Sequence, residues 1–180
     1  MGGVRILEWL APGVPVAALD WEVVYRVEMP RVFNYFRYRG FERATAEDLT
    51  SATFEKAWRA RDRYRRDRAA VSTWLLAIAR NVATDHFRRS RPEVPLVQDA
   101  ASAEETPETA ALRAGQSFRL TALLRALPER ERDLLALKYG ADATNRAIAT
   151  LTGLSESNVG TILHRTVVSL RSRWNEGGPQ

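Results

Sequence analysis

One stretch of the chain, residues 93–112, has no periodic apolar pattern and divides the sequence into two parts. It holds five acidic and no basic residues, and it includes Pro95, Pro107 and a centre rich in alanine and serine. A segment of low hydrophobicity with charge of one sign cannot offset the entropy lost on folding. Structureless loops longer than about 12–15 residues are uncommon inside compact domains. The sequence therefore predicts a flexible acidic linker between two small domains.

The linker sets the expected domain boundaries. A length of 180 residues allows one domain or two small ones. We expect a lead-in over 1–20, a first domain over 21–92, the linker over 93–112, a second domain over 113–175 and a tail over 176–180.

The composition excludes several classes of site. The chain has no cysteine and two histidines, so we expect no disulfide, no thiol chemistry, no metal site and no cofactor. It has no glycine-rich phosphate loop, no H-E-x-x-H and no G-x-S-x-G motif, which predicts that it is not an enzyme. No apolar run reaches the ~20 residues that a membrane-spanning helix needs, and no signal peptide is evident. We expect a cytoplasmic protein without membrane insertion.

Apolar residues recur at helical spacing throughout the first part, over 21–38, 46–60 and 73–89. β-branched alternation is absent, so the sequence predicts an all-α fold. The expected inward stripe of the first helix is Val24, Val27, Phe33 and Phe36.

Local signals predict where these helices start and end. Pro30 predicts a kink in the first helix and Gly40 its end. Thr45 to Asp48 resembles a capping box and places the start of the second helix there.

Basic charge gathers in the first part of the chain. Residues 21–92 hold 16 basic and nine acidic residues. The arginine-rich run 59–68, with Tyr64 in it, is a candidate surface for phosphates and stacked bases, and further arginines follow at 88–91. The alternative is a solvated loop whose arginines pair with Asp62 and Asp67.

The second part reads as a series of helices. Residues 107–127 form the first of them, and Pro128 marks the start of a second that ends at Gly140. A short helix over 144–152 follows.

Gly153 and an N-capping Ser155 then introduce a helix that reaches Trp174. This order is the helix-turn-helix pattern. The expected inward face of the last helix is Val159, Leu163, Thr166, Leu170 and Trp174.

The outward side of the last helix carries short polar and basic side chains suited to base edges and phosphates. They are Ser157, Asn158, Thr161, His164 and Arg165. The alternative is an ordinary amphipathic hairpin.

Taken together, these blocks resemble a known family. The residues that carry the likeness are Ala46 to Thr50, Thr53, Phe54, Ala57, Trp58, Trp74, Leu75, Ile78 to Asn81, Asp85, Arg88, Arg89, Leu127 to Arg130, Leu134 and the helix-turn-helix. They resemble bacterial RNA polymerase sigma factors of the sigma-70 family, extracytoplasmic-function (ECF) group. The likeness covers about residues 22–174.

The resemblance implies a helical sigma domain 2, a helix-turn-helix sigma domain 4 and a non-enzymatic role in transcription initiation. It implies binding to core RNA polymerase through the β′ clamp helices and the β flap, and to promoter DNA. It also implies an anti-sigma factor, around which the two domains could close.

The resemblance also assigns residues to each surface. Those for core polymerase are Asp48, Leu49, Thr53, Phe54 and Trp58. Those for melting and reading the −10 element are Tyr64, Arg65, Arg66, Trp74, Asn81, Arg88 and Arg89, with Asn81 at a pocket for a flipped base. Those for the −35 element are Arg146, Ser157, Asn158, Thr161, His164 and Arg165.

The last helix departs from the family pattern. Relatives usually have a Lys-Ser-Arg step where this chain has Gly160, Thr161 and Ile162, and further arginines where it has Val167 and Val168. We therefore expect weak −35 binding, and Ile162, Val167 and Val168 offer an apolar surface for the flap or an inhibitor.

Two other functions fit parts of the sequence. An operator-binding regulator needs the helix-turn-helix but has no need of the block from Trp74 to Asn81. An RNA-binding module would use the arginine-rich run and prefer duplex RNA to forked DNA.

Overall fold

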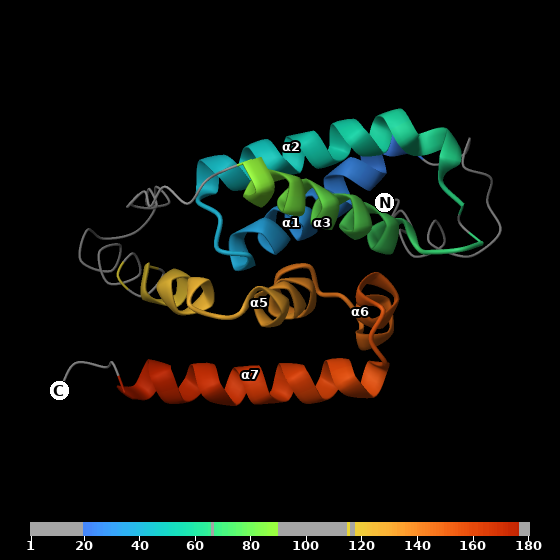
Figure 1. Cartoon of the computed structure of the whole chain (residues 1–180). Helices are drawn as coiled ribbons and strands as arrows, with labels where there is room; N and C mark the ends of the chain where they lie inside the picture. The colour runs from blue at the N-terminus through green and yellow to red at the C-terminus, as the bar shows by residue number, and fades with distance from the viewer. Residues whose placement is uncertain (1–19, 66, 90–114, 116–117, 177–180) are drawn as a thin grey trace, which may run out of the picture.

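A computed structural model of the chain describes residues 20–65, 67–89, 115 and 118–176, and it contains helices and no strand over these residues. The helices form two layers (Figure 1). The first layer comprises α1 (Trp21–Tyr38), α2 (Arg43–Ala60), the short η3 (Arg61–Arg63) and α3 (Val71–Arg89). The second layer comprises the helical residues 118–125, α5 (Glu129–Leu135), η4 (Ala136–Gly140), α6 (Asn145–Thr152) and α7 (Glu156–Glu176).

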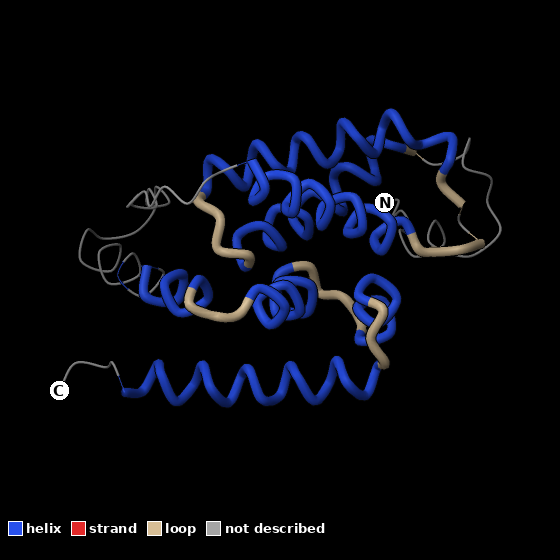
Figure 2. The backbone as a smooth tube through the Cα atoms, viewed as in Figure 1, coloured by secondary structure: helices blue, strands red, loops and turns tan. Residues whose placement is uncertain are grey.

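Figure 2 shows the same arrangement as a backbone tube, with α7 lying along the outside of the second layer. The all-α prediction is confirmed. The expected linker over 93–112 lies outside the described residues, and so does the expected lead-in over 1–20 except for Asp20. Among the described residues, no helix is both long and apolar enough to span a bilayer.

The first helix has the predicted ends. The Asp20 carboxylate accepts a hydrogen bond from the Glu22 amide at 3.0 Å, and Gly40, with φ +86°, follows the last turn. The predicted inward stripe is only partly right. Its buried residues are Val24, Glu28, Val32, Tyr35 and Phe36, because the second layer also covers α1.

The second helix does not start at the predicted capping box. It begins at Arg43, since the Ala46 amide already bonds to the Glu42 carbonyl at 2.8 Å. Thr45 therefore lies within the first turn rather than at the cap. The third helix begins at Val71, two residues before its predicted start at Thr73.

Helix α5 begins at Glu129, with Pro128 at the N-cap position. It continues into η4, a turn of π-helix that ends at Gly140 as predicted. Of the predicted helix over 107–127, residues 115 and 118–125 are helical, and the other residues before 118 lie outside the described part.

The predicted helix-turn-helix is confirmed. The Thr144 hydroxyl accepts a hydrogen bond from the Ala147 amide at 3.1 Å, which caps α6. Gly153 adopts the left-handed conformation with φ +73°, and the Ser155 hydroxyl accepts from the Asn158 amide at 3.2 Å. The inward residues Val159, Leu163 and Thr166 are buried.

The two layers contact each other directly, and the buried apolar cluster includes residues of both. The most extensive contact of α1 is with η4 in the second layer. Gly140 makes this possible, because a Cβ atom there would lie 2.7 Å from the Asn34 carbonyl oxygen.

Two glycines give a matched test of the turn. We expect Gly153→Ala to lower the free energy of unfolding by about 1–2 kcal/mol, because an L-residue is strained at this φ while its Cβ would contact nothing. Gly160→Ala, inside α7, should instead raise it by roughly 0.5–1 kcal/mol. Urea unfolding measures both, and equal effects of the two substitutions would contradict the assigned turn.

Candidate nucleic-acid and polymerase interface

Asn81 lies on the exposed side of α3, beside a surface pocket of about 480 Å³ between α2 and α3. The other residues that line this pocket are Lys56, Ala60, Ile78, Thr84 and Asp85. The amide of Asn81 can both donate and accept hydrogen bonds. This side of α3 therefore offers a polar hollow to a group that arrives from solvent.

Cations surround the acidic group of this pocket. The Lys56 ammonium lies 3.5 Å from one Asp85 oxygen, and the Arg88 guanidinium donates to the other at 3.2 Å. Arg88 and Arg89 are exposed at the end of α3. The edge of the pocket therefore carries more positive than negative charge.

The arginine-rich run after α2 is partly neutralised by its own acids. Arg65 donates to both Asp67 oxygens at 3.2 and 3.3 Å, and this hydrogen bond lowers the pKa of Asp67. Arg61 covers the Trp58 ring, with 4.2 Å from its Cζ to the ring centroid. Arg66 lies outside the described residues. The described pairs agree with the alternative of a solvated loop whose arginines pair with its own aspartates. Such exposed ion pairs are weak, however, and leave the arginines available to phosphates.

Tyr64 is a core residue, which corrects its assignment as a base-stacking side chain. It is 2% exposed, its hydroxyl donates to the Ala69 carbonyl at 2.9 Å, and its ring lies 4.9 Å from that of Trp74. The ring fills the space between the loop and α3, so no base can reach its face. Trp74 is half-buried and also contacts Trp21.

The five residues assigned to core polymerase on α2 do not form one surface. Asp48 is exposed and Trp58 is 50% exposed. Leu49, Thr53 and Phe54 are buried, and the Thr53 hydroxyl donates to the Leu49 carbonyl at 2.7 Å. In this arrangement these three residues hold α2 on the layer, and a partner could contact only Asp48 and Trp58 directly.

The five residues predicted on the outward side of α7 are all exposed: Ser157, Asn158, Thr161, His164 and Arg165. Arg146 on α6 is exposed too, and its Nε donates to the Glu156 carboxylate at 3.1 Å. That bond joins the two helices of the helix-turn-helix across its turn. The structure therefore gathers the predicted −35 residues on one face.

The apolar residues of α7 adjoin this face. Val168 follows His164 by one helical turn, and Ile162 lines the same groove as Asn158 and Arg165. Val168 is 52% exposed, whereas Ile162 and Val167 are half-buried against the core. Ile162 also lines a groove with Leu127, Pro128, Arg130 and other residues of α5 and α7.

Sequence reasoning missed the residues that join the two layers. Arg80 on α3 donates to the carboxylate of Asp133 on α5, and so does the hydroxyl of Tyr35 on α1. Arg80 points away from the Asn81 pocket, although the two are neighbours in sequence. No local pattern marks these residues, because their partners lie at least 50 positions away.

Comparison with known proteins bears on these surfaces. The family model for sigma-70 region 2 matches residues 24–93, and the model for sigma-70 region 4 matches residues 117–170. The chain is 31% identical to the ECF RNA polymerase sigma factor BldN of Streptomyces coelicolor over 143 residues, which cover 77% of this chain and 54% of BldN. The chain belongs to the sigma-70 family, in the ECF group.

Two further proteins resemble this ECF sigma factor. It is 26% identical to the ECF sigma factor SigM of Bacillus subtilis over 156 residues, which cover 86% of this chain and 94% of SigM. Its fold matches the sigma factor RpoE in complex with the anti-sigma factor NepR from Bartonella quintana. That match has a TM-score of 0.68 and 16% identity, and it covers 88% of this chain and 99% of the RpoE chain. In this ECF sigma factor, the two matched regions correspond to the two helical layers.

The reassignment of Tyr64 can be tested by removing its hydroxyl. We expect Tyr64→Phe to lower the free energy of unfolding by about 0.5–1.5 kcal/mol, the usual net value of a lost hydrogen bond. Binding of single-stranded −10 DNA should not change, because the ring already lies in the core. Unchanged stability together with weaker DNA binding would restore the stacking role.

Proposed function

We propose that this ECF sigma factor binds core RNA polymerase and brings two separate DNA-binding surfaces to a promoter, one for each element. It acts by binding alone, melts the −10 region with binding energy and performs no covalent chemistry. Because its partners are bacterial polymerase and promoter DNA, we place this activity in the cytoplasm.

The first layer takes core polymerase and the −10 element. The outward side of α2, with Asp48 and Trp58, meets the β′ clamp helices. Asn81 receives a base flipped from the non-template strand. Flipping a base costs least once the duplex has begun to open. Arg88 and Arg89, together with Arg65 and Arg66, hold the neighbouring phosphates.

The second layer takes the −35 element. The N-terminal half of α7 enters the major groove, where Ser157, Asn158, Thr161 and His164 face base edges. Arg165 contacts a base or phosphate, and Arg146 lies near the backbone. The exposed side chain of Val168 meets a protein partner, either the β flap or an inhibitor.

An anti-sigma factor is the proposed regulator. The structural likeness to RpoE, solved in complex with the anti-sigma factor NepR, supports this part of the proposal. The absence of cysteine from this chain agrees with sensing by a partner rather than by a thiol switch within the chain.

One observation carries the proposal: the chain exposes polar and basic side chains on two surfaces, the Asn81 side of α3 and the outward face of α7, which lie on different layers. An operator-binding regulator needs only the second. The sigma-70 region 2 match over the first layer also favours the sigma role over that regulator and over an RNA-binding module.

Run-off transcription tests this function directly. We expect core polymerase to make discrete transcripts from genomic fragments only when the full-length protein is added. An active core that yields no protein-dependent transcript would overturn the proposal.

The role of Asn81 is tested by measuring DNA binding. Asn81→Ala should lower affinity for single-stranded non-template −10 DNA by roughly ten-fold, the scale of one lost bidentate base contact. Asn175→Ala, an exposed asparagine near the end of α7, is the matched control and should leave that affinity unchanged. Equal losses in the two variants would remove Asn81 from the −10 site.

The few cations on α7 predict weak, mildly salt-dependent −35 binding. Each phosphate contact contributes ~0.9 to the slope of log affinity against log salt concentration. For the full-length chain on a −35 duplex we expect a slope near −2, with Arg165→Ala reducing its magnitude by about 0.9. Arg171→Ala, further along the helix, should not change it. Nanomolar binding with a steep slope would contradict this expectation.

A further inference from the structure

Four aromatic side chains form a ladder where the start of α1 meets the C-terminal part of α2 (Figure 1). The ring centroids of Trp21 and Trp58 lie 5.7 Å apart, and those of Tyr25 and Phe54 lie 4.8 Å apart. Both pairs meet edge to face, an arrangement that aromatic rings prefer. Each helix contributes two residues four positions apart, so the two contacts follow one another along one face of the helix pair. We call these four residues the aromatic ladder.

The aromatic ladder is only partly covered. Phe54 is buried and Trp21 is partly buried, whereas Tyr25 is 49% exposed and Trp58 is 50% exposed. The two exposed rings are not scattered, because the other two rings of the ladder connect them. A contiguous apolar surface of this kind marks a site of interaction.

The sequence just before α1 has the composition to cover this surface. Residues 4–10 include five apolar side chains: Val4, Ile6, Leu7, Trp9 and Leu10. The match to sigma-70 region 2 begins only at residue 24, and none of the proposed DNA and polymerase contacts uses this segment. Both the segment and the ladder gain free energy when their apolar area leaves water.

The connectivity of the chain keeps this segment within reach of the aromatic ladder. The Asp20 carboxylate caps α1, so the residues before it lead directly to Trp21, a member of the ladder. Ten residues, 11–20, separate Leu10 from Trp21, and they span at most about 33–36 Å. Tyr25 lies one helical turn further on, or about 6 Å. The whole ladder is therefore accessible to residues 4–10 of the same chain.

Two further features of the lead-in suit a return of the chain onto α1 and α2. Pro12 and Gly13 form a dipeptide typical of turns, which allows the backbone to reverse direction. Glu8 is the one acidic residue in 4–10, and Arg61 borders the ladder with its Cζ 4.2 Å from the Trp58 ring centroid. An opposite charge at the edge of an apolar contact favours one orientation of the bound segment.

We propose that residues 4–10 fold back and dock on the aromatic ladder, with their apolar side chains over Tyr25 and Trp58. The segment is tethered to α1, and tethering gives it a high effective concentration at this surface. Trp58 is also the residue proposed to meet the β′ clamp helices, so the docked segment and core polymerase exclude each other there. This competition rests on the proposed function, whereas the docking itself does not.

Docking is tested by a distance measurement in the full-length protein without polymerase or DNA. The chain has no cysteine, so Gly3→Cys and Ser51→Cys, the latter exposed on α2, provide two sites for spin labels. We expect one short, narrow distance distribution for this doubly labelled chain. Adding Leu7→Ser and Leu10→Ser should give a longer, broader distribution, since serine removes the apolar area that holds the segment.

Two tyrosines give a matched test of the surface. Tyr25→Ser should broaden the distribution as well, because it removes an exposed ring of the ladder. Tyr139→Ser, on η4, replaces a tyrosine of similar exposure (52%) outside the ladder and should keep the distribution narrow. Circular dichroism checks that each variant remains helical.

Three results would overturn the docking. They are a broad distribution before any further substitution, narrow distributions in both the Leu7, Leu10 variant and Tyr25→Ser, or equal broadening by Tyr25→Ser and Tyr139→Ser. A mixture of chains that carry one label each distinguishes a second copy as the occupant. We expect no short distance in this mixture, and a short distance there would replace docking within the chain by docking between copies.

Competition is tested by equilibrium binding to core polymerase. If the segment is docked in about 90% of molecules, its release raises the apparent affinity for core polymerase by up to about ten-fold. The chain with Leu7→Ser and Leu10→Ser is the suitable variant, because it keeps Trp58. A released segment without any gain in this affinity would overturn the competition. No binding of core polymerase by any variant would overturn the proposed function, while the distance distributions would still decide whether the segment docks.

Discussion

A buried carboxylate needs partners, and Asp133 finds them in the other half of the chain. Taking a charge out of water costs several kcal/mol unless hydrogen bonds and opposite charges replace the lost solvation. The second layer supplies none of the three groups described around this carboxylate; Tyr35, Arg39 and Arg80 all belong to the first. This one group therefore helps to fix how the second layer lies on the first, beside the apolar contacts between α1 and η4.

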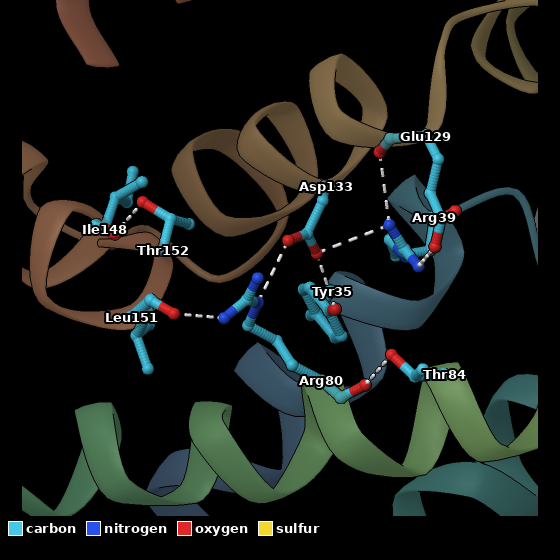
Figure 3. Close-up of polar contacts among 9 residues, drawn as sticks. All are labelled: Tyr35, Arg39, Arg80, Thr84, Glu129, Asp133, Ile148, Leu151 and Thr152. Carbon is cyan, nitrogen blue, oxygen red and sulfur yellow. Dashed lines mark hydrogen bonds and ion pairs between the residues drawn. The ribbon is translucent and has the colours of Figure 1, made fainter. Parts of the chain in front are cut away.

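The contact between the two layers is polar at its centre, where Tyr35, Arg39 and Arg80 meet Asp133 (Figure 3). Buried ion pairs often contribute little net stability relative to apolar contacts, but they penalise any misplaced arrangement. Shape then adds a second condition, since the backbone of α1 approaches η4 closely only because residue 140 is glycine. Together these features favour one placement of the second layer on the first.

Local signals in the sequence predicted most of the fold. The ends of α1 and the turn at Gly153 and Ser155 follow from caps and glycine conformations that involve only nearby residues. The start of α2 was predicted wrongly at Thr45, because a hydrogen bond from the Ala46 amide to the Glu42 carbonyl extends the helix upstream of the capping pattern. The prediction for Tyr64 rested on a local pattern, because an aromatic residue among arginines is typical of a nucleic-acid surface. Its burial depends instead on packing against Trp74, ten residues later in the chain. The hydrogen bonds between the two layers could not be predicted, since they join residues 53 to 111 positions apart.

The proposed −10 site and the contact between the layers lie on two different sides of α3. Thr84 lines two pockets. One is the pocket beside Asn81, and the other lies between the layers and is bordered by Arg39, Arg80 and Asp133. Consecutive helical residues point about 100° apart, so Arg80 contacts the second layer while Asn81 faces solvent. One side of α3 therefore contacts the second layer through Arg80, while the neighbouring side presents Asn81 to solvent.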